Sequence, residues 1–298
     1  ALADPEDAPA DVLRTADSAV RVAKDSANER VAVFSEDQRR TSQRNVRTAE
    51  TLTRALAGDY IRAWFQPVVS LADGAVVGYE SLARLIEPGH APLAAADFIE
   101  VAESTDLVSD IGGRVIDQAL DFVGQVKPGQ VVGVNASPRQ MLRPGFVDDL
   151  LALMKDRDVD PQQVAVELTE HTAMRLTHDL VSDMQRLADA GVVILLDDFG
   201  TGYSSATLLQ ELPVRGLKLD ASFTRTVTSD PGARRLVKGL AGLASNLGIR
   251  AVAEGIETAE QADIVADLGW EFGQGLYFGK PRPPGFARRA RPRRVKRG

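Results

Sequence analysis

The sequence predicts an α/β fold, a closed (β/α)8 TIM-like barrel that occupies most of the chain. From Trp64 onward, short apolar runs alternate with amphipathic helical stretches, which is typical of repeated strand–helix units around a parallel sheet. Eight such runs fall within about 220 residues, close to the size of one such barrel. Acidic and amide residues recur near the ends of these runs, where barrel enzymes place their active sites. One large domain with a short appendage therefore accounts for the 298 residues.

The expected strands are short, apolar and rich in β-branched residues. They cover residues 65–69, 76–82, 131–135, 164–168, 192–197, 216–219, 250–254 and 272–278. Helices are expected between most of them, over residues 98–123, 147–155, 179–190, 233–247 and 259–268. Periodicity alone does not decide closure, but the number and spacing of the strands favour a barrel over an open sheet.

The ends of the chain differ in character from this central part. Residues 10–24 have mostly helical spacing and are followed by a strand-like run at 31–34, which is too little for a domain. The polar stretch 36–57 stops at Gly58 and predicts a connecting helix. The last fourteen residues hold seven Lys or Arg and no acid, and we expect a disordered tail. The predicted division is therefore 1–35, 36–58, 59–284 and 285–298.

Composition excludes several classes of function. The net charge of −7 argues against a protein that binds a nucleic-acid polymer. The absence of cysteine rules out disulfides and thiolate metal sites and fits a cytoplasmic location. No run of about 18 apolar residues and no signal-peptide pattern occurs, so any membrane anchor would lie outside this chain.

Residues able to bind metal or carry charge fall near the ends of different predicted strands. They are Glu80, Asn135, Glu167, Asp197, Asp198, Lys218, Glu254 and Gln274. One acid in such a place is often a helix cap or a solvated residue, but a repeated pattern favours a shared site. Lys218 is either an ordinary surface lysine or, alternating with the leucines on both sides, a residue directed into the barrel.

The chemistry of this set favours a hard cation. Carboxylates and an amide, without cysteine and with the histidines placed elsewhere, suit Mg²⁺ or Mn²⁺. Clustered carboxylates repel one another, so a pair of divalent ions gives a reason for the cluster to exist. Two such ions can activate a water and stabilise an in-line phosphoryl displacement. The pattern therefore predicts phosphodiester hydrolysis.

The segment 195–205 carries two adjacent acids followed by two glycines. Neighbouring residues on a strand point to opposite faces, so Asp197 and Asp198 reach one site only if the strand ends there. Gly200 and Gly202 permit the dihedrals that such a break needs. A plain turn is the alternative. A protein-kinase interpretation of Asp-Phe-Gly fails because its companion motifs are missing.

Taken in order, these residues resemble the EAL family of cyclic di-GMP phosphodiesterases, from about Trp64 to Pro284. The motifs are Glu80-Ser81-Leu82 with Arg84, Asn135-Ala136-Ser137-Pro138, Glu167-Leu168-Thr169-Glu170, the loop from Asp197 to Ser205, Leu217-Lys218-Leu219-Asp220, Ala253-Glu254-Gly255-Ile256-Glu257-Thr258, and Gln274-Gly275 before Lys280-Pro281. Each motif is weak alone, whereas the ordered set is strong. Ser81 stands where the family has alanine, and Leu276 precedes Tyr277 where the family has tyrosine first.

The resemblance implies a barrel of EAL type, a bacterial signalling enzyme that converts cyclic di-GMP to linear pGpG. The residues around two Mg²⁺ or Mn²⁺ ions would be Glu80, Asn135, Glu167, Asp197, Asp198 and Glu254. With Glu80, the catalytic residues would be Lys218, which would position or activate the water, and Glu254, a candidate proton acceptor. Arg84 would grip a phosphate, while Gln66 and Leu82 would line the guanine side. Glu170 would support the Asp198 loop, and Glu257 and Gln274 would lie near the metals.

The N-terminal piece resembles the last helix and strand of a GGDEF domain, through residues 16–24 and 31–34. The signature loop of a cyclase is absent, so the chain is expected to be a fragment of a longer GGDEF–EAL protein with upstream GGDEF or sensory domains. A homodimer is possible. The alternative to an enzyme is a receptor module that binds cyclic di-GMP without cleaving it, although no ligand residue is visibly lost.

Overall fold

The computed structural model describes residues 36–173, 177–201, 209 and 211–286. The predicted GGDEF remnant over residues 1–35 and nearly all of the basic tail lie outside the described residues. The division into domains therefore remains a prediction, while the part that holds the motifs of the barrel is described almost throughout.

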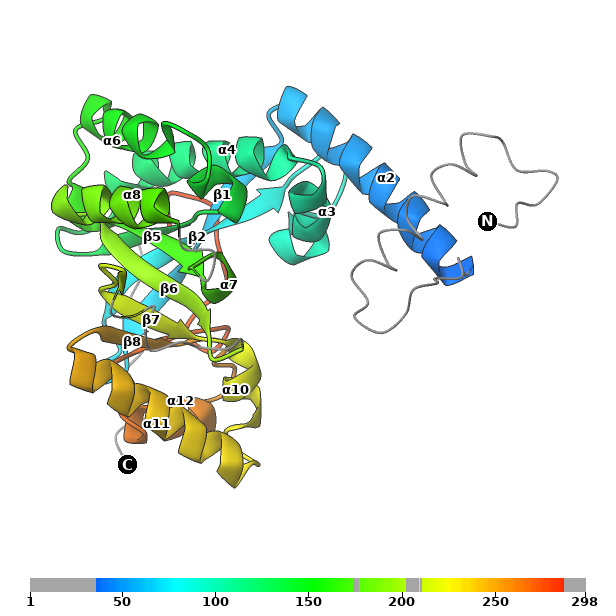
Figure 1. Cartoon of the computed structure of the whole chain (residues 1–298). Helices are drawn as coiled ribbons and strands as arrows, with labels where there is room; N and C mark the ends of the chain where they lie inside the picture. The colour runs from blue at the N-terminus through cyan, green and yellow to red at the C-terminus, as the bar shows by residue number, and fades with distance from the viewer. Residues whose placement is uncertain (1–35, 174–176, 202–208, 210, 287–298) are drawn as a thin grey trace.

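Eight strands close into a barrel, which confirms the predicted α/β TIM-like fold (Figure 1). The strands are β1 (Ile61–Ser70), β2 (Val76–Leu85), β4 (Val131–Asn135), β5 (Val164–Thr169), β6 (Val193–Phe199), β7 (Gly216–Leu219), β8 (Arg250–Ala253) and β9 (Phe272–Gln274). Neighbours pair in the order β1-β9-β8-β7-β6-β5-β4-β2, and β1 returns to pair with β2. A short strand β3 (Leu93–Ala94) continues the sheet beside β2.

The predicted parallel sheet has an exception at β1, which runs antiparallel to both β2 and β9. The reason lies in the connection, because only residues 71–75 join β1 to β2 and a parallel crossover needs a dozen or more. Gly74 has a φ of 70°, and the Asp73 carboxylate accepts a hydrogen bond of 3.0 Å from the Ala75 N–H. A tight turn therefore forces a hairpin at this point.

The β1–β2 hairpin extends beyond the barrel. Its pairing continues to Ile61 opposite Leu85, whereas β2 pairs with β4 only from Gly78 to Ser81. One face of the extension packs on helix α4 (Leu107–Val123), where Phe65 stacks on Phe122 with ring centroids 3.7 Å apart. Because side chains alternate along a strand, Trp64 and Gln66 on either side of Phe65 lie on the opposite face of the hairpin, away from α4.

Helices cover the outside of the barrel close to the predicted places. They are α3 (Ile99–Ser104), α4, α5 (Pro138–Met141), α6 (Phe146–Asp156), α7 (Glu170–Ala173), α8 (His178–Asp189), α10 (Ala221–Thr226), α11 (Pro231–Leu247) and α12 (Ala259–Asp267). The single helix expected over 98–123 is broken at Asp106, which has a φ of 62°. Helix α3 ends at Ser104, and the Thr105 hydroxyl donates a hydrogen bond of 2.6 Å to the Val101 carbonyl at this end.

The connecting helix is present over the expected residues as α2 (Glu36–Ala57). It projects from the barrel and reaches α3 and α4 with its C-terminal half (Figure 1). Leu52 and Ala55 are fully buried there. Within the described ranges, no helix is long and apolar enough to cross a membrane.

The last strand is shorter than expected and stops at Gln274 instead of Phe278. At Gly275 the chain passes so close to Ile256 that a Cβ would lie 2.1 Å from the Ile256 carbonyl oxygen. The Phe278 N–H then bonds back to the Gly275 carbonyl at 3.1 Å, which turns the chain. This close approach, which is not visible in the apolar pattern, ends the strand.

Candidate functional site

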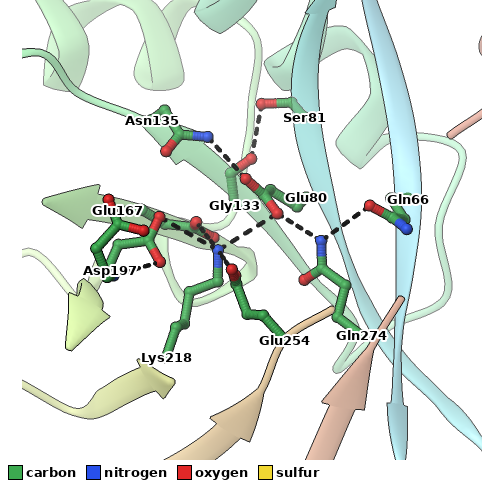
Figure 2. Close-up of polar contacts among 11 residues, drawn as sticks. Gln66, Glu80, Ser81, Gly133, Asn135, Glu167, Asp197, Lys218, Glu254 and Gln274 are labelled. Atoms are coloured by element: carbon green, nitrogen blue, oxygen red, sulfur yellow. Dashed lines mark hydrogen bonds and ion pairs between the residues drawn. The ribbon is translucent and has the colours of Figure 1, made fainter. Parts of the chain in front are cut away.

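A buried lysine surrounded by four carboxylates occupies the barrel interior (Figure 2). Lys218 lies in β7 with 2% of its side chain exposed. Its Nζ is 2.5 Å from Glu167, 2.6 Å from Glu254, 3.3 Å from Glu80 and 3.5 Å from Asp197. The interpretation as a surface lysine is therefore wrong, and the one that directs Lys218 inward is confirmed. We call these five residues the Lys218 cluster.

Parallel pairing explains how distant residues of the sequence meet in the Lys218 cluster. Asn135 pairs with Glu167 across β4 and β5, and Thr169 pairs with Asp197 across β5 and β6. Glu254 follows directly after β8. The carboxyl ends of parallel strands meet at one rim, so these side chains converge.

Glu80 reaches the same rim from the middle of β2, not from its end. Glu80 pairs with Gly133 of β4, and β2 continues beyond this pair to Leu85. The residue that lies near the rim is therefore in the middle of β2. Gly133 also makes room for the neighbouring acid, since a Cβ there would lie 2.1 Å from Glu167 Oε1. Any other residue at Gly133 would displace the Glu167 carboxylate.

Amide side chains hold Glu80 in place. Asn135 Nδ2 donates to Glu80 Oε1 at 2.9 Å, and Gln274 Nε2 donates to Glu80 Oε2. The same Gln274 amide donates to Gln66 Oε1 at 3.3 Å, and Gln66 Nε2 donates to the Gly279 carbonyl at 3.1 Å. The predicted residues Gln66, Asn135 and Gln274 thus form one network with Glu80 (Figure 2).

The departure at Ser81 is accommodated without loss of a hydrogen bond. Its hydroxyl donates to the Gly133 carbonyl at 2.7 Å, inside the sheet. A buried hydroxyl that keeps a partner costs little free energy compared with an unpaired one. The serine is therefore compatible with the position that the family gives to alanine.

The four carboxylates of the Lys218 cluster exceed its single positive charge. Burial raises the pKa of Glu167 to about 8, with Glu80 and Asp197 adding repulsion against the attraction of Lys218. Burial likewise raises the pKa values of Asp197 and Glu254. For Glu80, burial is outweighed by Lys218 and by the hydrogen bonds from the two amides, so its pKa is lowered.

At Lys218 burial and the neighbouring charges act on the pKa in directions opposite to those at Glu167. Burial by itself would lower its pKa, but the surrounding acids raise it well above the ordinary value, so the ammonium stays charged. An excess of buried negative charge is unfavourable unless a cation or protons balance it.

The donor set fits a hard divalent cation. Carboxylate oxygens of Glu80, Glu167 and Asp197 lie within 4.8 Å of one another. Gln274 Oε1 is buried beside Glu80 and has no hydrogen-bond partner within the described residues. Carboxylate and amide oxygens are the ligands that Mg²⁺ and Mn²⁺ prefer. The cluster therefore has both the oxygen donors and the unbalanced charge that such an ion would satisfy.

The strand carrying the paired acids does not end at them, since β6 continues to Phe199, but it is distorted at Asp198. Asp198 has a φ of 54°, and the pairing of β6 with β7 shifts register between Leu196 and Phe199. The Asp198 N–H donates to Asp197 Oδ1 at 2.9 Å. Burial, with repulsion from Asp197, raises the pKa of Asp198 to about 6. Asp198 is half-buried next to the cluster, and the loop that follows passes outside the described residues.

Glu170 contacts this loop as the resemblance implies. It is buried, and its Oε2 accepts a hydrogen bond of 3.1 Å from the Gly200 N–H. Gly200 itself has a φ of 99°, a conformation that favours glycine. One carboxylate thus ties the start of α7 to the chain that leaves β6.

Comparison with known families gives a direct match. A family model described as EAL domain matches residues 49–281. The chain belongs to the EAL domain family.

Relatives of this EAL domain include named phosphodiesterases. The chain is 31% identical over 277 residues to the bifunctional diguanylate cyclase/cyclic di-GMP phosphodiesterase MucR of Pseudomonas aeruginosa, covering 92% of this chain and 40% of the relative. It is 34% identical over 223 residues to the cyclic di-GMP phosphodiesterase PA2567 of the same species, covering 74% and 38%. Thus the chain spans less than half the length of these curated relatives.

Solved structures agree with the fold of this EAL domain. The PaMucR phosphodiesterase in complex with c-di-GMP has a TM-score of 0.76 at 32% identity, covering 80% of this chain and 98% of that one. The EAL domain of Mycobacterium smegmatis DcpA has a TM-score of 0.65 at 29% identity, covering 75% and 93%.

One predicted residue of this EAL domain lies apart from the others. Glu257 is exposed, and its backbone N–H donates to Gln261 Oε1 at 2.8 Å. In the described part of the chain no contact joins its carboxylate to the Lys218 cluster. The distance in sequence from Glu254 is short, but the turn at Gly255, with a φ of 66°, redirects the chain.

The residues predicted to bind substrate lie on the hairpin of this EAL domain. Leu82 and Arg84 follow Glu80 at intervals of two on β2, so they share its face, and both are half-buried. The guanidinium of Arg84 lies 5.7 Å from the centre of the Trp64 indole. Trp64 was not predicted from the sequence, although its position two residues before Gln66 places it on the same face of β1.

Proposed function

We propose that this EAL domain is a phosphodiesterase that hydrolyses cyclic di-GMP to linear pGpG with the help of two Mg²⁺ or Mn²⁺ ions. The observation that carries the proposal is the Lys218 cluster, in which three buried carboxylates and the half-buried Glu254 face one ammonium. The named activities of the relatives support the choice of substrate.

The ions would be held by the acids that the resemblance implies. Glu80, Glu167 and Asp197 supply the close carboxylates, and Asn135, Asp198 and Glu254 complete the set. When bound, the ions supply positive charge that stabilises the phosphoryl oxygens and lowers the pKa of water.

Within the protein, Lys218 has two tasks. Its ammonium offsets the repulsion between the carboxylates that surround it. Its N–H groups are also donors that can orient a water molecule toward phosphorus. Because its pKa is raised, it stays protonated and acts by orientation and charge rather than as a base.

Glu254 is the candidate proton acceptor. Burial raises its pKa well above the ordinary value, which gives this carboxylate a higher affinity for a proton than an exposed glutamate has. The attacking water would lose a proton to Glu254, and its oxygen would bond to phosphorus. The bond from phosphorus to one ribose 3′ oxygen would break, and that oxygen would take up a proton from solvent, leaving a 3′ hydroxyl and a 5′ phosphate on linear pGpG.

Arg84 would bind a phosphate of the dinucleotide. Among the described residues, no carboxylate forms an ion pair with it, and its Nη1 donates only to the backbone carbonyl of Ala83, at 2.8 Å. Burial lowers the pKa of Arg84 against the pull of Asp97 and Glu80, but an arginine remains charged. Its fork of donors is therefore available for paired phosphate oxygens.

Product chromatography tests the proposal. Purified protein is incubated with cyclic di-GMP and either Mg²⁺ or Mn²⁺, and pGpG is expected. Asp197→Asn should abolish turnover, while Asp156→Asn makes the same change at an exposed residue at the far end of α6 and should not alter it. Tight binding of intact nucleotide with no product under either metal would overturn the enzyme and identify the receptor module instead.

The longer protein is part of the proposal. Since the chain spans less than half of its curated relatives, we infer upstream GGDEF or sensory domains whose signal reaches the barrel through α2. A homodimer is a second way to control turnover. Specific activity measured across protein concentrations would rise if a dimer is required and stay flat if it is not.

A further inference from the structure

The extended part of the hairpin presents a row of side chains that begins at the Lys218 cluster. Cross-strand pairs follow one another on a single face, as Gln66 opposite Glu80, Trp64 opposite Leu82, and Arg62 opposite Arg84. The other face is closed, because the alternate residues of β1 are fully buried under the helices. The row is therefore the free side of the hairpin.

The two tryptophans of the chain differ in a way that singles out Trp64. Trp270 is 3% exposed, and its Nε1 donates to the Val237 carbonyl at 3.2 Å. Trp64 is half-buried, yet its Nε1 is enclosed and has no hydrogen-bond partner within the described residues. Trp64 is therefore the tryptophan with part of its side chain open to a ligand, whereas Trp270 belongs to the core.

The spacing between Trp64 and the Lys218 cluster suits the distance between the base and the phosphate of one nucleotide. A step of two residues along a strand is about 6.8 Å. Trp64 lies one such step from Gln66, which pairs with Glu80, and its indole lies against Arg84. A phosphate bound between Glu80's metal site and Arg84 would bring the base of the same nucleotide beside the indole.

We propose that Trp64 forms a base-stacking subsite for one guanine of cyclic di-GMP. The proposal rests on the proposed function, since the ligand is the same dinucleotide. Stacking on an aromatic ring is a general way to hold a nucleobase, and the half-buried indole of Trp64 keeps part of its surface open. Arg84 would then both contact the Trp64 indole and bind the phosphate, on the same face of the hairpin.

Fluorescence provides a direct test because the chain has only two tryptophans. In Trp270→Phe, Trp64 is the sole indole and reports on its own surroundings. Rapid mixing with cyclic di-GMP and Mg²⁺ should quench its emission at once, and GMP at the same concentration should quench it less. Wild-type protein measured in parallel shows the same signal over a constant background, which covers the case in which Trp270→Phe does not fold.

Kinetics separate stacking from a structural role. Trp64→Leu should raise KM about 10- to 100-fold, the loss expected for one stacked base, with kcat changed little. Trp64→Phe keeps a ring and should restore most of the affinity. Thermal melting of both variants shows whether the fold is intact.

Two outcomes are decisive. Turnover by the wild type, with no quenching of Trp64 and an unchanged KM in a folded Trp64→Leu protein, overturns the stacking subsite and leaves the phosphodiesterase standing. Quenching of Trp64 with no product under either metal supports the subsite while the proposed enzyme fails.

Discussion

The parallel arc of the barrel and the antiparallel hairpin contribute different things to one site. Strands β5 to β7 supply the buried Glu167, Asp197 and Lys218, and the half-buried Glu254 follows β8; the pKa values of all four are raised. The hairpin supplies Trp64, Leu82 and Arg84, which are half-buried and open on one face. Charge is concentrated in the interior of the barrel, whereas the hairpin carries the residues that we propose to recognise the ligand. Glu80 belongs to both regions, since it sits on β2 and contacts Lys218.

The largest effect is expected in the arc. Lys218→Met keeps the length of the side chain but removes its charge, leaving four carboxylates without their shared cation. We expect kcat to fall at least about 100-fold, in the range that positioned acid–base groups contribute. Product formation at saturating cyclic di-GMP measures this, with Asp156→Asn as the control. Activity within threefold of wild type would show that the ammonium is not needed.

Glu254→Gln tests the proton acceptor separately from the lysine. The amide keeps the shape but cannot accept the proton, so kcat should fall about 100-fold or more while affinity for the nucleotide changes little. Calorimetric titration of the slow variant gives the affinity. If binding is lost together with turnover, Glu254 holds the ligand or metal and is not primarily a base.

A smaller effect, of a different kind, is expected in the hairpin. Arg84→Lys keeps the charge but loses the planar fork, and we expect KM to rise about tenfold with kcat nearly unchanged. Steady-state kinetics over a range of cyclic di-GMP concentrations check this split. If kcat falls and KM does not, the separation between a catalytic arc and a recognition hairpin is wrong.

The charge imbalance in the arc predicts how stability depends on pH. Without a bound cation the Glu167 pKa is about 8, above the ordinary value of 4.5 that holds in the unfolded chain. The folded state therefore holds a proton that the unfolded chain releases, so stability is fullest below about 4.5 and falls as pH rises toward 8. The other raised acids, Asp197 and Glu254, act in the same direction.

Melting curves with chelator and with Mg²⁺ measure this dependence. The loss between pH 5 and 8 should be on the order of a few kcal/mol, and added Mg²⁺ should restore more stability at pH 8 than at pH 5. Equal metal stabilisation at both values would mean that protons do not compete with the ion in the Lys218 cluster.

The smallest effect on turnover is expected at Glu170, which accepts a hydrogen bond from the chain that follows β6. Glu170→Ala removes the acceptor of the Gly200 N–H and should lower kcat a few-fold through Asp197 and Asp198. Glu170→Gln keeps an acceptor oxygen and should retain most activity. Equal losses in both variants would assign the effect to the charge of Glu170 rather than to its hydrogen bond.

Much of the fold followed from local pattern. The runs at 131–135 and 216–219 became β4 and β7 with the expected ends, because apolar stretches between polar turns specify buried strands. The helix over residues 36–57 ended at Gly58 as its composition indicated. The acids at strand ends followed from the same pattern, since parallel strands share one rim.

Other features needed contacts between distant segments. The end of β9 at Gly275 follows from the close approach of Ile256, which belongs to another segment of the chain. Pattern in one segment carries no information on such neighbours.

The sequence by itself determined which residues carry charge and which strands hold them, because side-chain chemistry and alternation are local properties. Only the tertiary structure decided that Lys218 lies among all four acids and that Trp64 shares a face with Arg84. The physical reason is that distances between side chains depend on how strands pair, and the short turn at residues 71–75 made the first pair antiparallel.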